Sequence, residues 1–392
     1  MVVNLKSLTQ SENLEGNLFL LVSVSVLLPF YVGSAVIFLT TLYLLFQHRR
    51  DLRQIMRKQS WLFIFLIYSL IISIYFRNYI GVAVTFVLFL LFLLFNFYFQ
   101  IITPQLFLKQ IKIFTWGSIP LALLAFVRYT YYVFMNGYDL FYIFKYHNPQ
   151  IRAEATFFNP NYYGLYIAMV LVMAIYLMAK TKRPLDRWLS MIVIFLNLIS
   201  LFLTASRWSI PTCIVGIVLM VFFLKPKIAW GIGFALAGGF LTLFIKPELL
   251  PRFTTLAHAF DDRFAIWYTG WQIFITSPLI GRGPMAYVTF YYLFADQGKM
   301  HAHQLLIDTL ANYGIVGLMV LTMAFSHYFR NVVERVFQPK IRLELGLIVS
   351  ILVIVLFHGT MDVGIFWIQT GYILLSILVV PFCVLEQLEN EV

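Results

Sequence analysis

The sequence predicts an all-α polytopic integral membrane protein with about twelve transmembrane helices. Of its 392 residues, 61% are hydrophobic and only 11% are charged. Soluble domains do not have this balance. Backbone polar groups in lipid must find partners within their own segment, so we expect the spans to be helices. The two cysteines lie in apolar runs and predict neither a disulfide framework nor a thiolate metal site.

The apolar segments are separated by turns or by short basic clusters. Residues 17–46 form one block that is long for a single span and is interrupted between Pro29 and Gly33, so we interpret it as two short helices. Further spans are expected near residues 60–75, 79–102, 113–134, 160–179, 188–205, 209–224, 228–245, 302–325, 343–359 and 363–385. The longest connection, 246–300, is expected to be an extracytoplasmic loop with short helices, inserted into one membrane domain that covers residues 1–392.

The distribution of basic residues orients these spans in the membrane. Alternate threading places five clusters, which hold most of the 28 lysines and arginines, on one side. These clusters are residues 48–58, 109–112, 180–187, 225–227 and 326–342. Cytoplasmic loops carry such an excess, so this side is expected to be cytoplasmic. The net charge of +11 therefore indicates membrane orientation and not nucleic-acid binding.

The same threading gathers unusual polar residues at the opposite, outer face of the membrane. They are Asn159, Asn161, Arg207, the 246–300 loop, His301, His303, His358 and Asp362. Polar residues are common at helix ends, but the convergence of so many on one face indicates a site.

Asn159 and Pro160 have a structural explanation, because they match an N-cap and the first residue of a helix. Asn161 then remains as an amide that could bind a sugar hydroxyl. Arg207 stands between two spans with hardly any loop. It either snorkels to the interface or binds phosphate, for which guanidinium is a bidentate and permanently charged partner.

Within the long loop, Arg263, Trp267 and Trp271 fall four residues apart along one stripe of a predicted helix. Two aromatic residues beneath an arginine suit an amphipathic helix that rests on lipid. They equally suit a platform for a sugar with a clamp for phosphate. A turn at residues 281–284 carries Arg282, a further candidate for phosphate binding.

His301 and His303 stand at the head of the span expected at residues 302–325. Two residues apart on a helix, they would project to different sides and make a poor metal pair. Without clustered carboxylates nearby, we predict no metal and no cofactor. On the same helix, Gly314 and Gly317 would share a face with His303 and allow another helix to approach closely. An imidazole at a wet, phosphate-binding cavity suits proton transfer near neutral pH.

These motifs, in this order, resemble the O-antigen ligase and O-antigen/capsule polysaccharide polymerase (Wzy-type) superfamily. The most specific element is His-Gln, nine residues, Gly, two residues and Gly, which here begins at His303 and ends at Gly317. The other elements that carry the resemblance are Phe157 to Asn161, Ser206-Arg207, the Arg263-x-x-x-Trp267 helix, Pro278 to Gly283, and His358 to Asp362. The resemblance covers residues 155–385, and the N-terminal third matches in hydropathy alone.

The resemblance implies a metal-independent class C glycosyltransferase that acts on undecaprenyl-pyrophosphate-linked oligosaccharide. It implies a multi-pass protein of the cytoplasmic (inner) membrane, with an active site on the extracytoplasmic side and roles in cell-envelope, exopolysaccharide or capsule biosynthesis. A flippase and a chain-length regulator would be its partners. Carried over to this chain, His303 would be the general base, and Arg207 and Arg263, with Arg282 as a weaker candidate, would hold the pyrophosphate.

The remaining site candidates are those expected to contact sugar or line the pocket: Asn161, Trp267, Trp271, His301 and Asp362. The chain departs from the family pattern at Trp208, where a small residue usually follows Ser-Arg. This tryptophan narrows the space expected beside Arg207.

Three functions are compatible with these residues. A polymerase of lipid-linked repeat units is favoured over a ligase that moves a finished glycan to another acceptor, because no basic acceptor patch stands out on the outer face. A transporter or flippase of the same lipids is the third. It is disfavoured because the unusual residues gather at one membrane face, whereas transporters place them near the bilayer centre.

Overall fold

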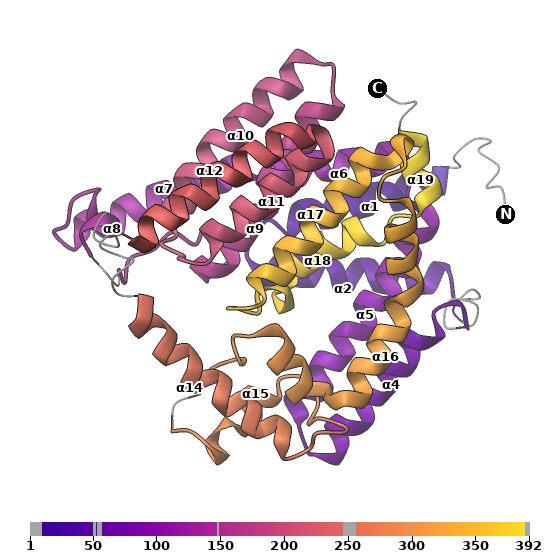
Figure 1. Ribbon diagram of the computed structural model, residues 1–392. Helices are drawn as coiled ribbons and strands as arrows, with labels where there is room; N and C mark the ends of the chain where they lie inside the picture. Colours follow the sequence, from indigo (N-terminus) through magenta and orange to yellow (C-terminus); the bar gives the residue numbers. More distant parts are fainter. Residues whose placement is uncertain are drawn as a thin grey trace.

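The computed structural model describes residues 10–49, 52, 57–146, 149–245, 256–296 and 298–388, and these residues form helices and connecting segments without strands (Figure 1). The first half of the chain contains α1 (Gln10–Ser25), α2 (Phe30–Gln47), α4 (Ser60–Tyr75), α5 (Tyr79–Ile101), α6 (Pro104–Trp116), α7 (Ser118–Met135), α8 (Tyr142–Lys145) and α9 (Pro160–Lys180). The second half contains α10 (Pro184–Leu203), α11 (Ser209–Leu224), α12 (Pro226–Ile245), α14 (Leu256–Ile275), α15 (Ala286–Phe290), η2 (Tyr291–Leu293), α16 (Leu305–Arg335), η3 (Pro339–Ile341), α17 (Arg342–His358), η4 (Gly364–Phe366), α18 (Ile368–Leu378) and α19 (Phe382–Gln387).

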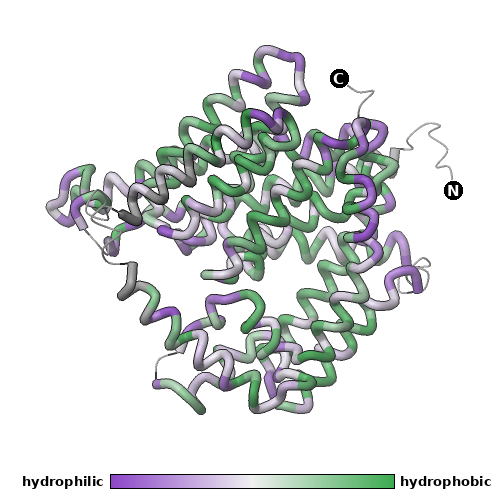
Figure 2. The backbone as a smooth tube through the Cα atoms, in the orientation of Figure 1, coloured by the Kyte–Doolittle hydropathy of each residue, from purple (hydrophilic) through white to green (hydrophobic). Residues whose placement is uncertain are grey.

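Length and hydropathy confirm a polytopic membrane protein. Among the described residues, seven helical segments are long and apolar enough to cross a membrane, and four shorter apolar helices accompany them. Figure 2 shows hydrophobic residues along the helices and hydrophilic residues concentrated at their ends and in the connections. The number of about twelve spans stays a prediction.

The N-terminal apolar block consists of two helices, as the sequence predicts. α1 ends at Ser25 and α2 begins immediately after Pro29. The break frees backbone carbonyl groups that need partners in an apolar environment. Gln369 of α18 donates hydrogen bonds to the carbonyls of Val26 and Leu28, so the break is also a contact between the two ends of the chain.

Two expected spans have different boundaries in the structure. The span expected at 113–134 begins earlier, because Thr103 caps α6 and Pro104 opens it, and Gly117 separates α6 from α7. Lys109 and Lys112 therefore lie on a helix and not before one. The span expected at 363–385 is divided into η4, α18 and α19, with Pro381 preceding α19.

α9 is the central helix of the core. Nearly all of its side chains are buried, and it packs against α10, α11 and α17. A helix that is hydrophobic on every face belongs in the interior of a bundle. The first residues of α9, which carry the Asn159–Asn161 motif, are thereby fixed against the end of α17.

Three basic clusters meet at one end of the bundle through ion pairs. Lys112 contacts Asp186 at 2.7 Å, Lys180 contacts Glu344 at 2.9 Å, and Arg335 contacts Glu386 at 2.9 Å. This agrees with the sequence-based threading, which places residues 109–112, 180–187 and 326–342 on the same side.

α16 is broken at Gly314, which has φ 63° and ψ −171°. The turn at residues 278–283 replaces the helical hydrogen bonds lost there: Arg282 N and Gly283 N donate to the carbonyls of Ala311 and Asn312, and Ile315 N donates to that of Pro278. A Cβ on Gly314 would collide with the Leu279 carbonyl. The expectation that His303, Gly314 and Gly317 share one face of a continuous helix is therefore wrong, although Gly317 does lie close to Tyr68 of α4.

Candidate catalytic site

The two histidines lie in an extended segment before α16 and not on the helix. Ala302 N donates to Asp308 Oδ1 at 2.8 Å, and Leu305 N donates to the Gly359 carbonyl at 2.6 Å. The Gln304 side chain caps the helix by accepting from Ile307 N. His303 has φ 52°, a left-handed conformation that non-glycine residues adopt at a cost of about 1–2 kcal/mol. Such strain is typical of functional segments.

His303 and Asp362 form a hydrogen-bonded pair. His303 Nδ1 lies 2.9 Å from Asp362 Oδ1, and the side chains are 17% and 3% exposed. A carboxylate accepts hydrogen bonds, so the proton of a neutral His303 resides on Nδ1. Its Nε2 then carries a lone pair, as a general base requires.

Asp362 accepts hydrogen bonds at both carboxylate oxygens. Val363 N donates to Oδ1 at 2.9 Å, in addition to His303, and Asn161 Nδ2 donates to Oδ2 at 2.7 Å. Burial raises the pKa of Asp362, but the hydrogen bond from His303 and the neighbouring imidazoles outweigh burial, so that its pKa lies well below the usual range. Asp362 is therefore a buried anion that holds His303 in one tautomer.

His301, His303 and Asp362 form a cluster of three side chains. His301 Nε2 lies 2.8 Å from the Tyr162 hydroxyl and 3.5 Å from Asp362 Oδ1, and His301 Nδ1 accepts from His303 N at 3.2 Å. Burial lowers the pKa of His301 to about 4; the charge of Asp362 opposes this shift, and His303 and Arg263 add to it. His301 is thus neutral near pH 7, with its proton on Nε2.

His301, His303 and Asp362 have the composition of a metal site, with donor atoms within 4.8 Å of one another. The expectation that the two histidines point apart is wrong, because they do not lie on the helix; their ring centroids are 4.3 Å apart. The tautomers assigned above nevertheless turn an N–H group, not a lone pair, of each ring toward Asp362: His303 Nδ1–H donates to it, and His301 Nε2–H lies 3.5 Å from it beside the Tyr162 hydroxyl. Ligation of a metal through the two ring nitrogens that face Asp362 would require both tautomers to change and would break the backbone contact at His301.

Arg263 of α14 brings a positive charge to this cluster. Its charge contributes to the lowered pKa of His301. Its Nη1 atom is buried, and the described residues provide it with no hydrogen-bond partner. A buried N–H group of a guanidinium without an acceptor is costly. The site therefore suits an anionic ligand.

α14 is positioned by close contacts with the histidine segment. Trp267 Nε1 donates to the His303 carbonyl at 3.4 Å. A Cβ on Gly270 would come within 3 Å of Ala302 and Ile307. Gly270 thus allows the helix that carries Arg263 to approach the cluster.

Asn161 is engaged at both ends of its amide, which was not expected from the sequence. Arg152 Nη2 donates to Asn161 Oδ1 at 2.9 Å, and Arg152 Nε donates to the Thr204 carbonyl at 2.7 Å. Since a guanidinium can only donate, Arg152 forces the Asn161 NH₂ group toward Asp362. Sequence reasoning missed Arg152 and Tyr162; the only signal was their proximity to the Phe157–Asn161 motif.

Arg207 lies in the turn between α10 and α11, next to the end of α17. The neighbouring Trp208 stacks on Phe357, with ring centroids 5.1 Å apart, and donates to the Phe357 carbonyl at 2.9 Å. The next residue, His358, has two buried ring nitrogens without hydrogen-bond partners among the described residues. Trp208 therefore attaches the Arg207 turn to the end of α17, next to His358.

Arg282 and Trp271 have other surroundings. The Arg282 guanidinium lies about 5 Å from the rings of Phe76 and Phe290, and its Nε donates to Thr276. Trp271 is 44% exposed and contacts Phe274. None of these contacts involves the cluster around Asp362, so the predicted roles of Arg282 and Trp271 gain no support from the structure.

The fold is that of a polytopic membrane protein, and its site combines a buried His–Asp pair with an arginine whose buried Nη1 has no hydrogen-bond partner among the described residues. Residues 192–322, about a third of the chain, match the family model of the O-antigen ligases. This match supports the resemblance of the chain to the O-antigen ligase and Wzy-type polymerase superfamily. No curated protein matches it. Asn161 and Asp362 lie outside the matched residues, yet the fold brings both to His303.

Proposed function

We propose that the protein is an inverting, metal-independent membrane glycosyltransferase that polymerises undecaprenyl-pyrophosphate-linked oligosaccharide repeat units. The reaction would occur at the outer face of the cytoplasmic membrane and build a surface polysaccharide. The observation that carries this proposal is the His303–Asp362 pair near Arg263, whose buried Nη1 has no hydrogen-bond partner among the described residues. The match of residues 192–322 to the O-antigen ligase family model supports a lipid-linked polysaccharide as the substrate class.

In the proposed reaction, His303 Nε2 takes the proton of an acceptor hydroxyl group. The acceptor oxygen bonds to the anomeric carbon of the donor sugar, on the face opposite the leaving group. The bond from that carbon to the pyrophosphate oxygen breaks, and undecaprenyl pyrophosphate leaves with the electron pair. Asp362 stabilises the imidazolium that forms, in the role that a carboxylate has beside other catalytic histidines.

The leaving pyrophosphate carries negative charge that a metal-independent enzyme must stabilise with its own cations. Arg263 is the first candidate, because its Nη1 is buried and has no hydrogen-bond partner in the part of the chain that the structure describes. Arg207 is the second, since its turn is attached through Trp208 to Phe357 at the end of α17, just before the His358–Asp362 segment. Fixed donors in a site of low polarity stabilise developing charge more strongly than water does.

A ligase reaction, in which a finished glycan is transferred to a different acceptor, is the second candidate. The matched family model, which describes O-antigen ligases, favours it. Both reactions use the same donor site and the same base. The polymerase remains our first choice because the outer segments of the sequence offer no basic patch for a separate acceptor lipid.

The test is incubation of the purified protein with lipid-linked oligosaccharide, with and without an added acceptor lipid. A ladder of products identifies a polymerase, and a single shifted band that requires the acceptor identifies a ligase. The absence of any covalent product would refute the transferase proposal and favour transport. A flippase and a chain-length regulator are the partners proposed for the cellular reaction.

A further inference from the structure

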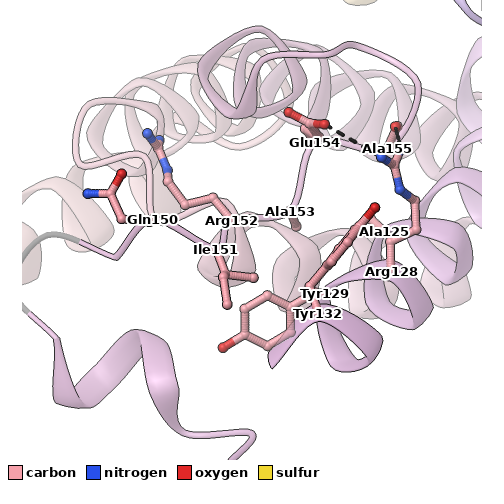
Figure 3. Close-up of a pocket in the computed structure, with 10 residues that line it drawn as sticks. All are labelled: Ala125, Arg128, Tyr129, Tyr132, Gln150, Ile151, Arg152, Ala153, Glu154 and Ala155. Carbon is pink, nitrogen blue, oxygen red and sulfur yellow. Dashed lines mark hydrogen bonds and ion pairs between the residues drawn. The ribbon is translucent and has the colours of Figure 1, made fainter. Parts of the chain in front are cut away.

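We propose that a cavity beside the catalytic pair is a binding subsite for one sugar residue of the substrate glycan. This inference rests on the proposed transferase function. The cavity has a volume of about 230 Å³ and lies between α7 and the segment that precedes α9. The polar and aromatic side chains that line it are Arg128, Tyr129, Tyr132, Gln150, Arg152 and Glu154 (Figure 3).

The lining has the chemistry that a pyranose requires. Sugar hydroxyl groups both donate and accept hydrogen bonds, and the cavity wall carries both kinds of partner. The two arginines are donors, Glu154, which lies 3.7 Å from Arg128, is an acceptor, and Gln150 is both. Figure 3 shows Arg152 and Gln150 on one side of the cavity and Arg128 and Glu154 on the other. The tyrosine rings supply flat apolar surface for the C–H face of a sugar ring.

The size of the cavity selects a single sugar. Sites for drug-sized ligands usually measure about 300–1,000 Å³. A cavity of 230 Å³ is smaller and has polar walls, so it suits one sugar residue better than a lipid chain. The rest of the glycan would extend from the opening.

Hydrogen bonds to the backbone already hold the walls in place. Ala153 N donates to the Leu203 carbonyl at 2.8 Å, and Arg152 Nε donates to the Thr204 carbonyl at 2.7 Å. Arg128 Nη1 donates to the Ala155 carbonyl at 2.9 Å. A wall fixed before binding loses little conformational freedom when the ligand enters.

The cavity shares a wall with the catalytic centre. Arg152 lines the cavity and donates to Asn161, which donates to Asp362, the partner of His303. Two short hydrogen bonds thus separate a residue of the cavity from the carboxylate that orients the base. A glycan with its reacting end at His303 would have a neighbouring sugar within reach of the cavity. Both the donor and the acceptor glycan have such a sugar.

Tyr132→Ala is the direct test, and Tyr131→Ala is its matched control. Both tyrosines lie on α7 and are 47% and 58% exposed, but only Tyr132 lines the cavity. The probe is the oligosaccharide repeat released by mild acid from the lipid-linked pool of the producing cells. Its binding to protein in nanodiscs is followed by saturation-transfer NMR. We expect Tyr132→Ala to weaken binding about tenfold and the control to leave it unchanged.

Gln150→Ala provides a second variant on the opposite wall, and thermal unfolding confirms that each variant is folded. In the transfer assay, KM should rise with little change in kcat. The concentrations of donor and acceptor glycan are varied separately, and the acceptor is carried on a labelled short-chain lipid. If the KM for the donor rises, the donor glycan occupies the subsite; if the KM for the acceptor rises, the acceptor glycan does. Wild-type affinity in both variants, or no binding to the wild-type protein, would overturn the subsite. Binding without transfer by the wild-type protein would instead overturn the proposed function.

Discussion

Exchanging the amide and the carboxylate between Asn161 and Asp362 tests the catalytic pair most directly. In the native arrangement, Asp362 Oδ1 accepts from His303 and from Val363 N, and Oδ2 accepts from Asn161. In Asp362→Asn, an NH₂ group must face one of these donors, whichever way the new amide turns. Asn161 cannot turn to accommodate it without giving up its hydrogen bond from Arg152.

The magnitude follows from the hydrogen bonds that Asp362→Asn breaks. Each buried donor without an acceptor costs about 1–3 kcal/mol, and His303 is also deprived of the anion that stabilises its protonated form. We expect Asp362→Asn to lower kcat by about 10³–10⁴-fold, as in other enzymes in which the carboxylate partner of a catalytic histidine is removed. Asn161→Asp should also be damaging, because it places two carboxylates next to each other.

In the double variant Asn161→Asp/Asp362→Asn, each hydrogen bond among residues 161, 362, Arg152, His303 and Val363 again has one donor and one acceptor. The new carboxylate accepts from the new amide and from Arg152, and the amide oxygen accepts from His303 and Val363 N. Because one charge-assisted hydrogen bond contributes about 1.5–3 kcal/mol, we expect the double variant to be at least about tenfold more active than Asp362→Asn. The assay is the initial rate of product formation from lipid-linked oligosaccharide. If Asp362→Asn keeps a tenth of the wild-type rate, or the exchange restores nothing, the assigned roles are wrong.

Four further predictions concern the same site. His303→Ala should leave the protein folded and inserted but lower transfer by about 10²–10⁴-fold, because a proton acceptor is removed; polymer of normal length in such a strain would contradict its role as the base. Arg263→Lys should be nearly as damaging as Arg263→Ala, since an ammonium cannot reproduce the bidentate fork, and full activity of the lysine variant would indicate a generic charge. Transfer should continue in excess EDTA, and a loss that one cation restores would show that the enzyme needs a metal. Burial lowers the pKa of His301 from 6.5 to about 4, so the unfolded chain takes up a proton between these pH values that the folded protein does not. The contribution of His301 to the free energy of unfolding should therefore be constant above pH 6.5 and fall by up to about 3 kcal/mol toward pH 4. Thermal unfolding measured at pH 7.5 and at pH 5 should show a loss of stability at the lower pH in the wild-type protein and a smaller loss in His301→Gln.

Local sequence patterns predicted most of the helices, because each pattern acts over a few residues. Asn159 caps α9 as expected, with its Oδ1 accepting from Asn161 N at 2.8 Å, and Pro160 is the first residue of the helix. The interruption of the first apolar block at Pro29 likewise marks the start of α2. The break at Gly314 could not be predicted in this way, because Gly314 lies in an apolar run that looks continuous. Its positive φ depends on the turn at residues 278–283, which replaces the helical hydrogen bonds lost there.

By itself, the sequence determined a membrane-embedded helical chain, the identity of its unusual polar residues, and the membrane face on which we expect them. Hydropathy and charge set these features, since lipid forces each backbone segment to satisfy its own hydrogen bonds. Only the tertiary structure decided which polar residues meet. Asp362 contacts His303, which is 59 residues away in the sequence, and Asn161, which is 201 residues away. Whether these side chains meet depends on how α9, α16 and α17 pack. The same packing placed Arg282 between two aromatic rings and placed Arg152 against Asn161. Neither contact could be predicted from the sequence, because the partners of a side chain depend on which segments pack against it.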